Sequence, residues 1–213
     1  MEAIVPSTAG SSPGRRAGGT RAVETAARRR RLLEAAVALA AEGGYEAVQM
    51  RDVAARAEVA LGTLYRHYSS KDQLLLAAMA AQADVLRCRL EQRPPRGNTA
   101  AERVSEGLRR ACTALERQGT VTSAMVTAMS STDGDVAPVK QAVQDSLRRM
   151  IAGAIGDDIV DDSCDDPVEH LDAIVKVLGA VWFAGLAFWV GGMTKSGAMA
   201  DDLERAAHLL LDR

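Results

Sequence analysis

The sequence predicts an all-α protein of about nine helices, and three observations support this fold class. Alanine and leucine, which are strong helix formers, fill every long segment. Aromatic residues make up only 3% of the chain and β-branched residues are sparse, so little favours strands. Apolar residues recur every three or four positions, which is the spacing of one side of a helix. The 213 residues suffice for a small domain followed by a larger one.

Residues 1–20 are predicted to be a flexible, disordered tail. They are rich in Gly, Ser, Pro and Ala, so they cannot bury enough apolar surface to offset the entropy of ordering. The first helix should run from Arg21 through the arginine run at 28–31 and stop at Gly43 and Gly44. The arginine run can be a solvated helix surface. Alternatively, it and the arginines upstream contact phosphates or enter the minor groove of DNA.

Two short helices are expected next, at about 50–58 and 61–68. A fourth helix starts after them, because Ser69 with Asp72, or Ser70 with Gln73, has the spacing of a capping box. This helix should end at the Pro-rich breaker at 94–98. The later helices are expected at about 100–118, 122–130, 136–155, 167–190 and 199–211, with an acidic solvated loop at 157–166 whose Asp166 caps the helix that Pro167 begins.

The segment 49–68 has the pattern of a helix-turn-helix, in which a second short helix of suitable size enters the major groove of DNA. Its small core can be formed by Val53, Ala54, Ala57, Val59, Leu64 and Tyr68. The exposed side and ends are then formed by Leu61, Gly62, Thr63, Tyr65, Arg66 and His67. Small residues at 60–63 would let the N-terminus of this helix come close to a phosphate.

The stretch from Gly43 to Leu74 resembles, continuously over three helices, the DNA-binding domain of the TetR family of bacterial repressors. The resemblance implies DNA contacts for Arg51, for recognition-helix residues and for Lys71 at the start of the next helix. Gln49 stands where many members have a Ser or Thr cap, which leaves its role open. The predicted DNA-binding residues are Gln49, Arg51, Ala60, Leu61, Gly62, Thr63, Tyr65, Arg66, His67 and Lys71.

The same resemblance implies two domains after the tail. Residues 21–75 would form the helix-turn-helix DNA-binding domain, and residues 76–213 a helical ligand-binding and dimerisation domain. The last two helices would then build an intersubunit four-helix bundle in a homodimer. Residues 45–51, 181–182 and 186–189 are similar to those of TetR-family repressors of steroid catabolism in actinobacteria. That closer resemblance implies a small hydrophobic ligand, a steroid or an acyl-CoA.

All the Phe and Trp residues of the chain lie between positions 182 and 189. Trp182, Leu186 and Trp189 share one side of a helix, and Phe183 is rotated by about 100° from Trp182. Ligand pockets are mainly apolar, and methionines adapt to fill them. The predicted ligand-binding residues are therefore Met125, Met129, Trp182, Phe183, Leu186 and Trp189; the alternative is that these residues pack in a core or a dimer interface.

Other classes of function have little support in the sequence. Cys88, Cys112 and Cys164 have no metal-binding spacing, so we expect structural thiols in a reducing cytoplasm, with no metal and no cofactor. No nucleophile–base signature appears, so an enzyme is not expected. The longest apolar run, 175–193, contains Lys176 and four glycines, which favours burial in a core or dimer interface over a membrane span.

These features together predict a DNA-binding transcription regulator, which a small hydrophobic ligand releases from double-stranded operator DNA. The first 72 residues carry more basic than acidic residues and the rest the reverse, although the net charge is −2. The fourth helix joins the DNA-binding domain to the ligand-binding domain. Its movement can therefore change the position of the DNA-binding helices when a ligand binds. Two rival functions are a hydrophobic-metabolite binding protein with a non-functional helix-turn-helix and a small all-α enzyme.

Overall fold

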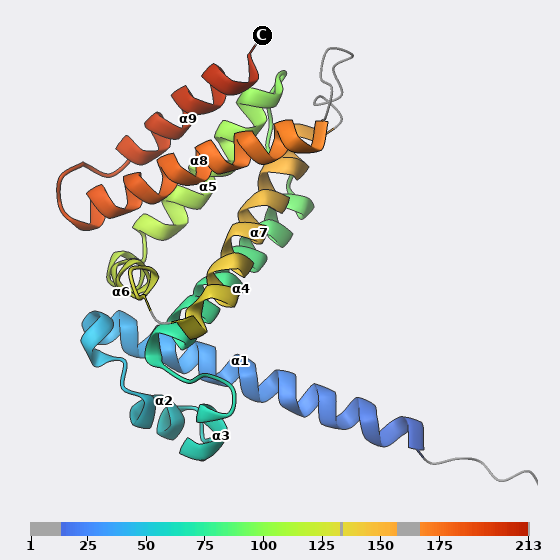
Figure 1. Cartoon of the computed structure of the whole chain (residues 1–213), viewed down its shortest axis with the longest axis vertical. Coiled ribbons are helices and arrows are strands. Elements are labelled where there is room, and N and C mark those ends of the chain that lie inside the picture. Colours follow the sequence, from blue (N-terminus) through green and yellow to red (C-terminus); the bar gives the residue numbers. More distant parts are fainter. Residues whose placement is uncertain (1–13, 133, 157–166, 213) are drawn as a thin grey trace, which may run out of the picture.

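The computed structural model describes residues 14–132, 134–156 and 167–212, and all regular structure in these ranges is helical, as predicted (Figure 1). The elements are α1 (Gly14–Ala47), α2 (Met50–Arg56), α3 (Leu61–Tyr65), α4 (Lys71–Gln92), α5 (Ala100–Glu116), α6 (Gly119–Met129), the 3₁₀ turn η1 (Gly134–Val136), α7 (Ala137–Ile155), α8 (Pro167–Val190) and α9 (Ala198–Leu211). The predicted acidic loop, its cap Asp166 and Cys164 lie outside the described residues.

Helix α1 begins inside the segment predicted to be a flexible tail. Residues 14–20 are helical, and residues 1–13 lie outside the described ranges. A helix that packing has already nucleated gains one hydrogen bond for each residue added, so it can extend beyond the residues that pack. Figure 1 shows the N-terminal half of α1 projecting from the molecule. Near its other end α1 is interrupted at Gly43 and Gly44, as predicted; Gly44 has a φ of 70°, which glycine adopts readily.

One of the two capping boxes considered for α4 is confirmed. Ser70 Oγ accepts a hydrogen bond from the backbone N–H of Gln73 at 3.2 Å. Gln73 Oε1 accepts one at 2.6 Å from the backbone N–H of Ser69, the residue before the cap, so the return bond reaches one residue further than in the standard box. These bonds satisfy backbone donors at the exit of the helix-turn-helix, so the direction in which α4 leaves it is fixed.

The described residues bury two hydrophobic clusters. The first joins α1, α2, α3, the first half of α4 and most of the buried side of α6. It includes the predicted small core, with Val53, Ala54, Ala57, Leu64 and Tyr68 buried and Val59 packed against them. The second joins α5, α7, α8 and α9. Helices α4 and α6 contribute to both clusters, and α4 runs beside α7 between the two ends of the molecule (Figure 1).

Helix α8 is apolar but poorly covered in a single copy of the chain. The most apolar 18-residue window of its segment Val168–Val190 has a mean hydropathy of 2.0, and only 17% of that window is buried. By length and composition alone this helix could cross a membrane. On its covered side it contacts α9 closely, because a Cβ atom added at Gly185 would lie 2.7 Å from Cγ of Met199. On another side of α8, Ala173, Val177, Ala180 and Ala184 are exposed.

Candidate nucleic-acid interface

Helix α3 has one covered side and one open side. Leu64 is fully buried and Tyr68, in the turn that follows, is 4% exposed. Tyr65 is 51% exposed and Leu61 40% exposed. At the N-terminus, Ala60 precedes the helix in an extended conformation. A Cβ atom at Gly62 would meet no atom within 4 Å, so this end of the helix is open to a large partner.

The remaining polar residues predicted for α3 gather beside it. Thr63 Oγ1 accepts a 3.3 Å hydrogen bond from an NηH group of Arg66, whose side chain is exposed. His67 is half-buried and lies on another side, where its ring centroid is 6.3 Å from that of Tyr68. Arg51 is exposed on the preceding helix α2. These positions are compatible with the predicted contacts, which stay predictions.

Gln49 does not cap α2 with its side chain. Its Nε2 instead donates a 2.9 Å hydrogen bond to the backbone carbonyl of Glu46, at the end of α1. The residue is exposed, so its side chain would have to give up this local bond to contact DNA with the same nitrogen.

Lys71, predicted to contact a phosphate, is held by the end of α1. Its ammonium group lies 3.7 Å from the centre of the Tyr45 ring and 3.6 Å from a carboxylate oxygen of Glu46. Tyr45 in turn donates a 2.5 Å hydrogen bond to Oδ1 of Asp72. Burial, reinforced by the Asp72 carboxylate, raises the pKa of Tyr45 to about 12. Sequence reasoning missed this cluster, because its partners are far apart along the chain and no local spacing joins them.

A hollow of about 230 Å³ lies between α1, the turn after α3, the start of α4 and the start of α7. It is lined by Arg29, His67, Tyr68, Gln73, Ala77 and Val139. Across it, Arg29 Nε donates a 3.1 Å hydrogen bond to the hydroxyl of Tyr68. Gln73 Nε2 donates one to the backbone carbonyl of Asp135 at 3.2 Å, which links the start of α4 to the turn before α7.

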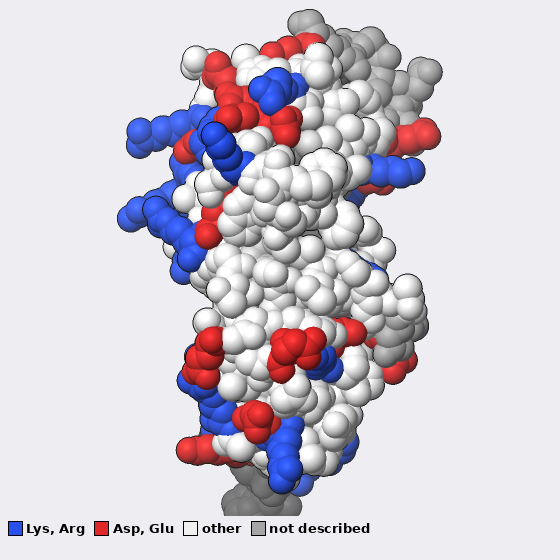
Figure 2. All heavy atoms as spheres, turned by 90° about the vertical axis from the view of Figure 1, so that its left-hand side faces the viewer, with Lys and Arg blue, Asp and Glu red and all other residues white. Residues whose placement is uncertain are grey.

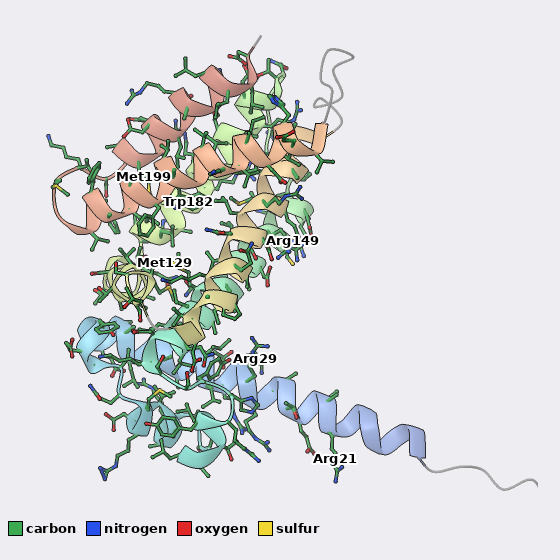
Figure 3. The ribbon with its side chains drawn as sticks, in the orientation of Figure 1. Arg21, Arg29, Met129, Arg149, Trp182 and Met199 are labelled. Carbon is green, nitrogen blue, oxygen red and sulfur yellow. The ribbon has the colours of Figure 1, made fainter. Side chains whose placement is uncertain are left out.

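The structure does not bring the six predicted ligand-binding residues together. Met125 and Leu186 are buried in different clusters, and Met129 packs against the first of these. Trp182 packs against the second cluster, and Figure 3 shows Met129 and Trp182 on different helices, α6 and α8. Phe183 is exposed on the outer side of α8.

One contact does link two of the helices involved. A Cβ atom at Gly119, the first residue of α6, would lie 3.4 Å from the indole of Trp189 on α8. The two helices also share a composition, because α6 and residues 177–194 contain no charged residue. Figure 2 shows a broad uncharged band across the middle of one face of the molecule, between charged ends.

Within the described ranges, no group of three or more His, Cys, Asp and Glu side chains could hold a metal ion. Cys112 is buried, and burial raises the pKa of its thiol to about 12. A protonated thiol is a poor nucleophile and a poor metal ligand, so Cys112 serves packing.

Known families and proteins match both parts of the chain. The family of bacterial regulatory proteins described as tetR family matches residues 32–78, and the tetracyclin repressor-like C-terminal domain matches residues 97–210. The HTH-type transcriptional repressor KstR of Rhodococcus jostii is 37% identical over 184 residues, which are 86% of this chain and 82% of that protein. KstR of Mycobacterium tuberculosis is 32% identical over 86% of this chain and 80% of its own length.

Solved structures share the fold. A TetR transcriptional regulator from Rhodococcus sp. RHA1 superposes with a TM-score of 0.78 at 30% identity, covering 89% of this chain and 98% of the other. FadR of Thermus thermophilus, a repressor solved in complex with lauroyl-CoA, has a TM-score of 0.67 at 19% identity, covering 85% and 92%. The latter similarity concerns the fold alone.

Proposed function

This chain belongs to the TetR family of bacterial regulatory proteins, and we propose that it is a cytoplasmic homodimeric repressor that an apolar CoA thioester releases from its operator. Its relatives are named HTH-type transcriptional repressors, and transcription regulation is accordingly its function. The observation that carries the proposal is that α3 is buried on one side and exposed on the other. Leu64 is fully buried in the core, whereas Tyr65 and the N-terminal end of the helix are exposed to solvent.

In the proposed complex α3 enters the major groove with its N-terminal end first. Tyr65, Thr63 and Lys71 contact phosphates or base edges, and Arg51 and Gln49 reach the groove from α2. The ten predicted residues lie at the start of α2, on α3 and the residues beside it, and at the start of α4, and in this proposal these three places contact one duplex together. One such unit has a small contact area, so selective binding needs two copies on two half-sites.

The second copy is proposed to pack on the open side of α8. Exposed residues recur there every three or four positions, at Ala173, Val177, Ala180 and Ala184, and Phe183 and Phe188 lie at the margins. Small side chains let two helices approach closely, and the aromatic margins add apolar area. A dimer interface would remove from water the apolar surface that one copy leaves exposed, so no membrane is needed to explain α8.

The proposed ligand class follows from the similar proteins and from the composition of the C-terminal domain. The similarity to KstR, together with the resemblance of residues 181–182 and 186–189 to steroid-catabolism repressors, favours a steroid or lipid CoA thioester. A fold neighbour was solved with lauroyl-CoA. The uncharged helix α6 and the uncharged C-terminal part of α8 suit an apolar ligand. Of the six predicted residues, Met129, Trp182 and Trp189 are partly exposed in this packing and are the side chains best placed to meet a ligand first.

Helix α4 is proposed to transmit the signal, because α7 is attached to it by a polar cluster. Ser146 Oγ donates a 3.0 Å hydrogen bond to Oδ1 of Asp84, and Arg149 lies 3.5 Å from the same carboxylate. Figure 3 shows Arg149 on α7 where it runs beside α4. Since α4 also carries Lys71 and Asp72, a shift of α7 would move the DNA-reading helices. The ligand need only bind the released arrangement better than the DNA-bound one.

The experiment is a fluorescence anisotropy titration of a labelled duplex from the region upstream of the protein's own coding sequence. We expect specific binding that lauroyl-CoA or the CoA thioester of a sterol-derived acid weakens, with a parallel change in tryptophan fluorescence. Free CoA is the control for the charged part of the ligand. Ligand binding without DNA binding would favour the alternative, a hydrophobic-metabolite binding protein with a non-functional helix-turn-helix. DNA binding that no thioester affects would contradict the ligand class only.

A further inference from the structure

Residues 21–31, in the projecting N-terminal half of α1, are strongly basic, and none of them is buried by the part of the chain that the structure describes. Residues 21–27 and 29–31 are exposed and Arg28 is half-exposed. Between positions 21 and 31 the sequence has five arginines and one carboxylate, Glu24, and Arg15 and Arg16 precede them. We call residues 14–31 the basic arm.

Several charges of the basic arm have no partner within the described ranges. Arg30 lies 3.5 Å from Glu34, and Arg29 is bonded to Tyr68. Arg21, Arg28 and Arg31 form no ion pair within those ranges. Four consecutive arginines repel one another, and a polyanion would relieve that repulsion. The basic arm therefore has the charge of a surface that meets an anionic partner.

The basic arm lies at the same end of the molecule as the helix-turn-helix. The bond from Arg29 to the Tyr68 hydroxyl, 3.1 Å long, attaches it to the turn after α3. Arg21 and Arg28 are two helical turns apart, and Arg28 is one turn from the buried Leu32. Their side of the helix is thus the one that packs on the DNA-reading unit further along. Figure 3 shows Arg21 on the projecting part of α1, on the same side of that helix as α2 and α3, and Figure 1 shows no other labelled helix beside this part of α1.

We propose that the basic arm is a second DNA-contacting element, which binds phosphates of the operator outside the major-groove segment contacted by α3. The inference rests on the proposed function, because it requires α3 to be seated on DNA. The 18 residues of the basic arm span about 27 Å as a helix, which is most of one turn of B-DNA. Contacts of this kind position the protein and carry no sequence information, so they add affinity at any flanking sequence.

The test compares two footprints of one complex. Dimethyl sulfate reports guanines protected in the major groove, and hydroxyl radicals report protected backbone. For the triple variant R21Q/R28Q/R31Q we expect the guanine pattern of the wild type, with the loss of backbone protection at additional positions. Its affinity should fall at least tenfold at low salt. The slope of log K against log salt should become less negative by about 0.9 for each phosphate that the variant no longer neutralises.

Two further variants serve as controls. R21K/R28K/R31K keeps the charges and should keep the backbone footprint. R89Q/R96Q/R117Q removes three exposed arginines of the C-terminal domain and should change neither footprint nor salt slope.

The proposal is overturned if R21Q/R28Q/R31Q keeps the wild-type backbone footprint and salt slope. It is also overturned if that variant becomes monomeric by sedimentation, since the basic arm would then contact the partner chain. A wild type that protects no position on the upstream duplex would contradict the proposed function itself, whereas wild-type binding with an unchanged variant footprint contradicts only the role of the basic arm.

Discussion

The hydroxyl of Tyr45 donates a 2.5 Å hydrogen bond to Oδ1 of Asp72, and this bond joins the element before the helix-turn-helix to the element after it. Lys71, beside Asp72, places its ammonium group over the same ring. One polar cluster therefore links the end of α1, just before α2, to the start of α4, just after α3. A displacement of the start of α4 would be passed to α1 through this contact.

The first prediction concerns the ionisation of Tyr45. Its pKa is raised to about 12, first by burial and then by Asp72, so Asp72→Asn should lower the pKa part of the way towards the ordinary value of about 10. Because the folded-state pKa lies above the unfolded one, the stabilisation is complete below pH 10 and is lost as the pH rises through 12. The absorbance of tyrosinate during a pH titration measures this, with Asp52→Asn as the control. An unchanged titration in Asp72→Asn would contradict the assignment.

The second prediction concerns the turn between α2 and α3. Glu58 has a φ of 54°, a left-handed conformation that costs a residue with a Cβ atom about 1–2 kcal/mol. Glu58→Gly should therefore stabilise the protein by up to about 1 kcal/mol, after the greater entropy loss of glycine, and raise Tm by about 2–4 °C. Calorimetry measures the change. The matched control Ala55→Gly, at an exposed position in the last turn of α2, should lower the stability by up to about 1 kcal/mol.

The third prediction separates DNA reading from folding. Tyr65 is half-exposed on α3, so Tyr65→Ala should abolish measurable operator binding and leave dimerisation and Tm nearly unchanged. Leu64→Ala, one residue away, should instead lower the free energy of unfolding by about 2–5 kcal/mol, because Leu64 is fully buried. Anisotropy titration and thermal unfolding check the pair. Full operator affinity in Tyr65→Ala would show that the open side of α3 does not face DNA.

The fourth prediction tests the contact of α8 with α9. A methyl group at Gly185 would overlap Met199, so Gly185→Ala should destabilise the protein by about 1–3 kcal/mol. Adding Met199→Ala should restore part of the loss, because it removes the overlapping atoms. A double-mutant cycle in urea measures the coupling. Strict additivity of the two substitutions would contradict the described packing.

The fifth prediction tests the proposed dimer. Ala180→Glu places a carboxylate in the middle of the open side of α8, where a second copy would bury it. We expect monomers in sedimentation equilibrium and operator affinity at least tenfold weaker, since each copy then binds one half-site alone. Ala114→Glu, exposed on α5, is the matched control. A dimeric Ala180→Glu variant with normal affinity would move the interface away from α8.

The helices could be predicted from the sequence because their signals are local. Ser70 and Gln73 lie three residues apart and mark the start of α4, and the two glycines at 43 and 44 interrupt α1. The core of the helix-turn-helix was predicted for the same reason, since Val53, Ala57 and Leu64 follow helical spacing. The start of α1 was not predicted. Composition indicates the entropy lost when a segment becomes ordered, but it does not show that a helix already packed further along the chain can extend into that segment.

The ligand domain was harder to predict, because its side chains meet over long distances in the sequence. Met125 and Leu186 are both apolar and both buried, yet they pack in separate clusters. In a region rich in alanine and valine, many different ways of packing the helices against one another satisfy the same hydrophobic periodicity. Phe183 illustrates this limit. The sequence shows that Phe183 and Trp182 point in different directions from the helix, but it does not show which side of α8 is exposed to solvent.

The participation of α6 in the first cluster affects how this protein could be divided. Ala124, Met125 and Ala128 of α6 are buried together with Leu32 and Ala36 of α1. A truncated chain that ended within α4 would expose the part of the α1 surface that α6 covers, and would lose part of its folding free energy. The N-terminal helices α1–α4 can therefore not be fused to the ligand-binding domain of another protein by cutting the chain after α4. A working chimera would need a helix in place of α6 that packs against α1 with the same small, apolar side chains.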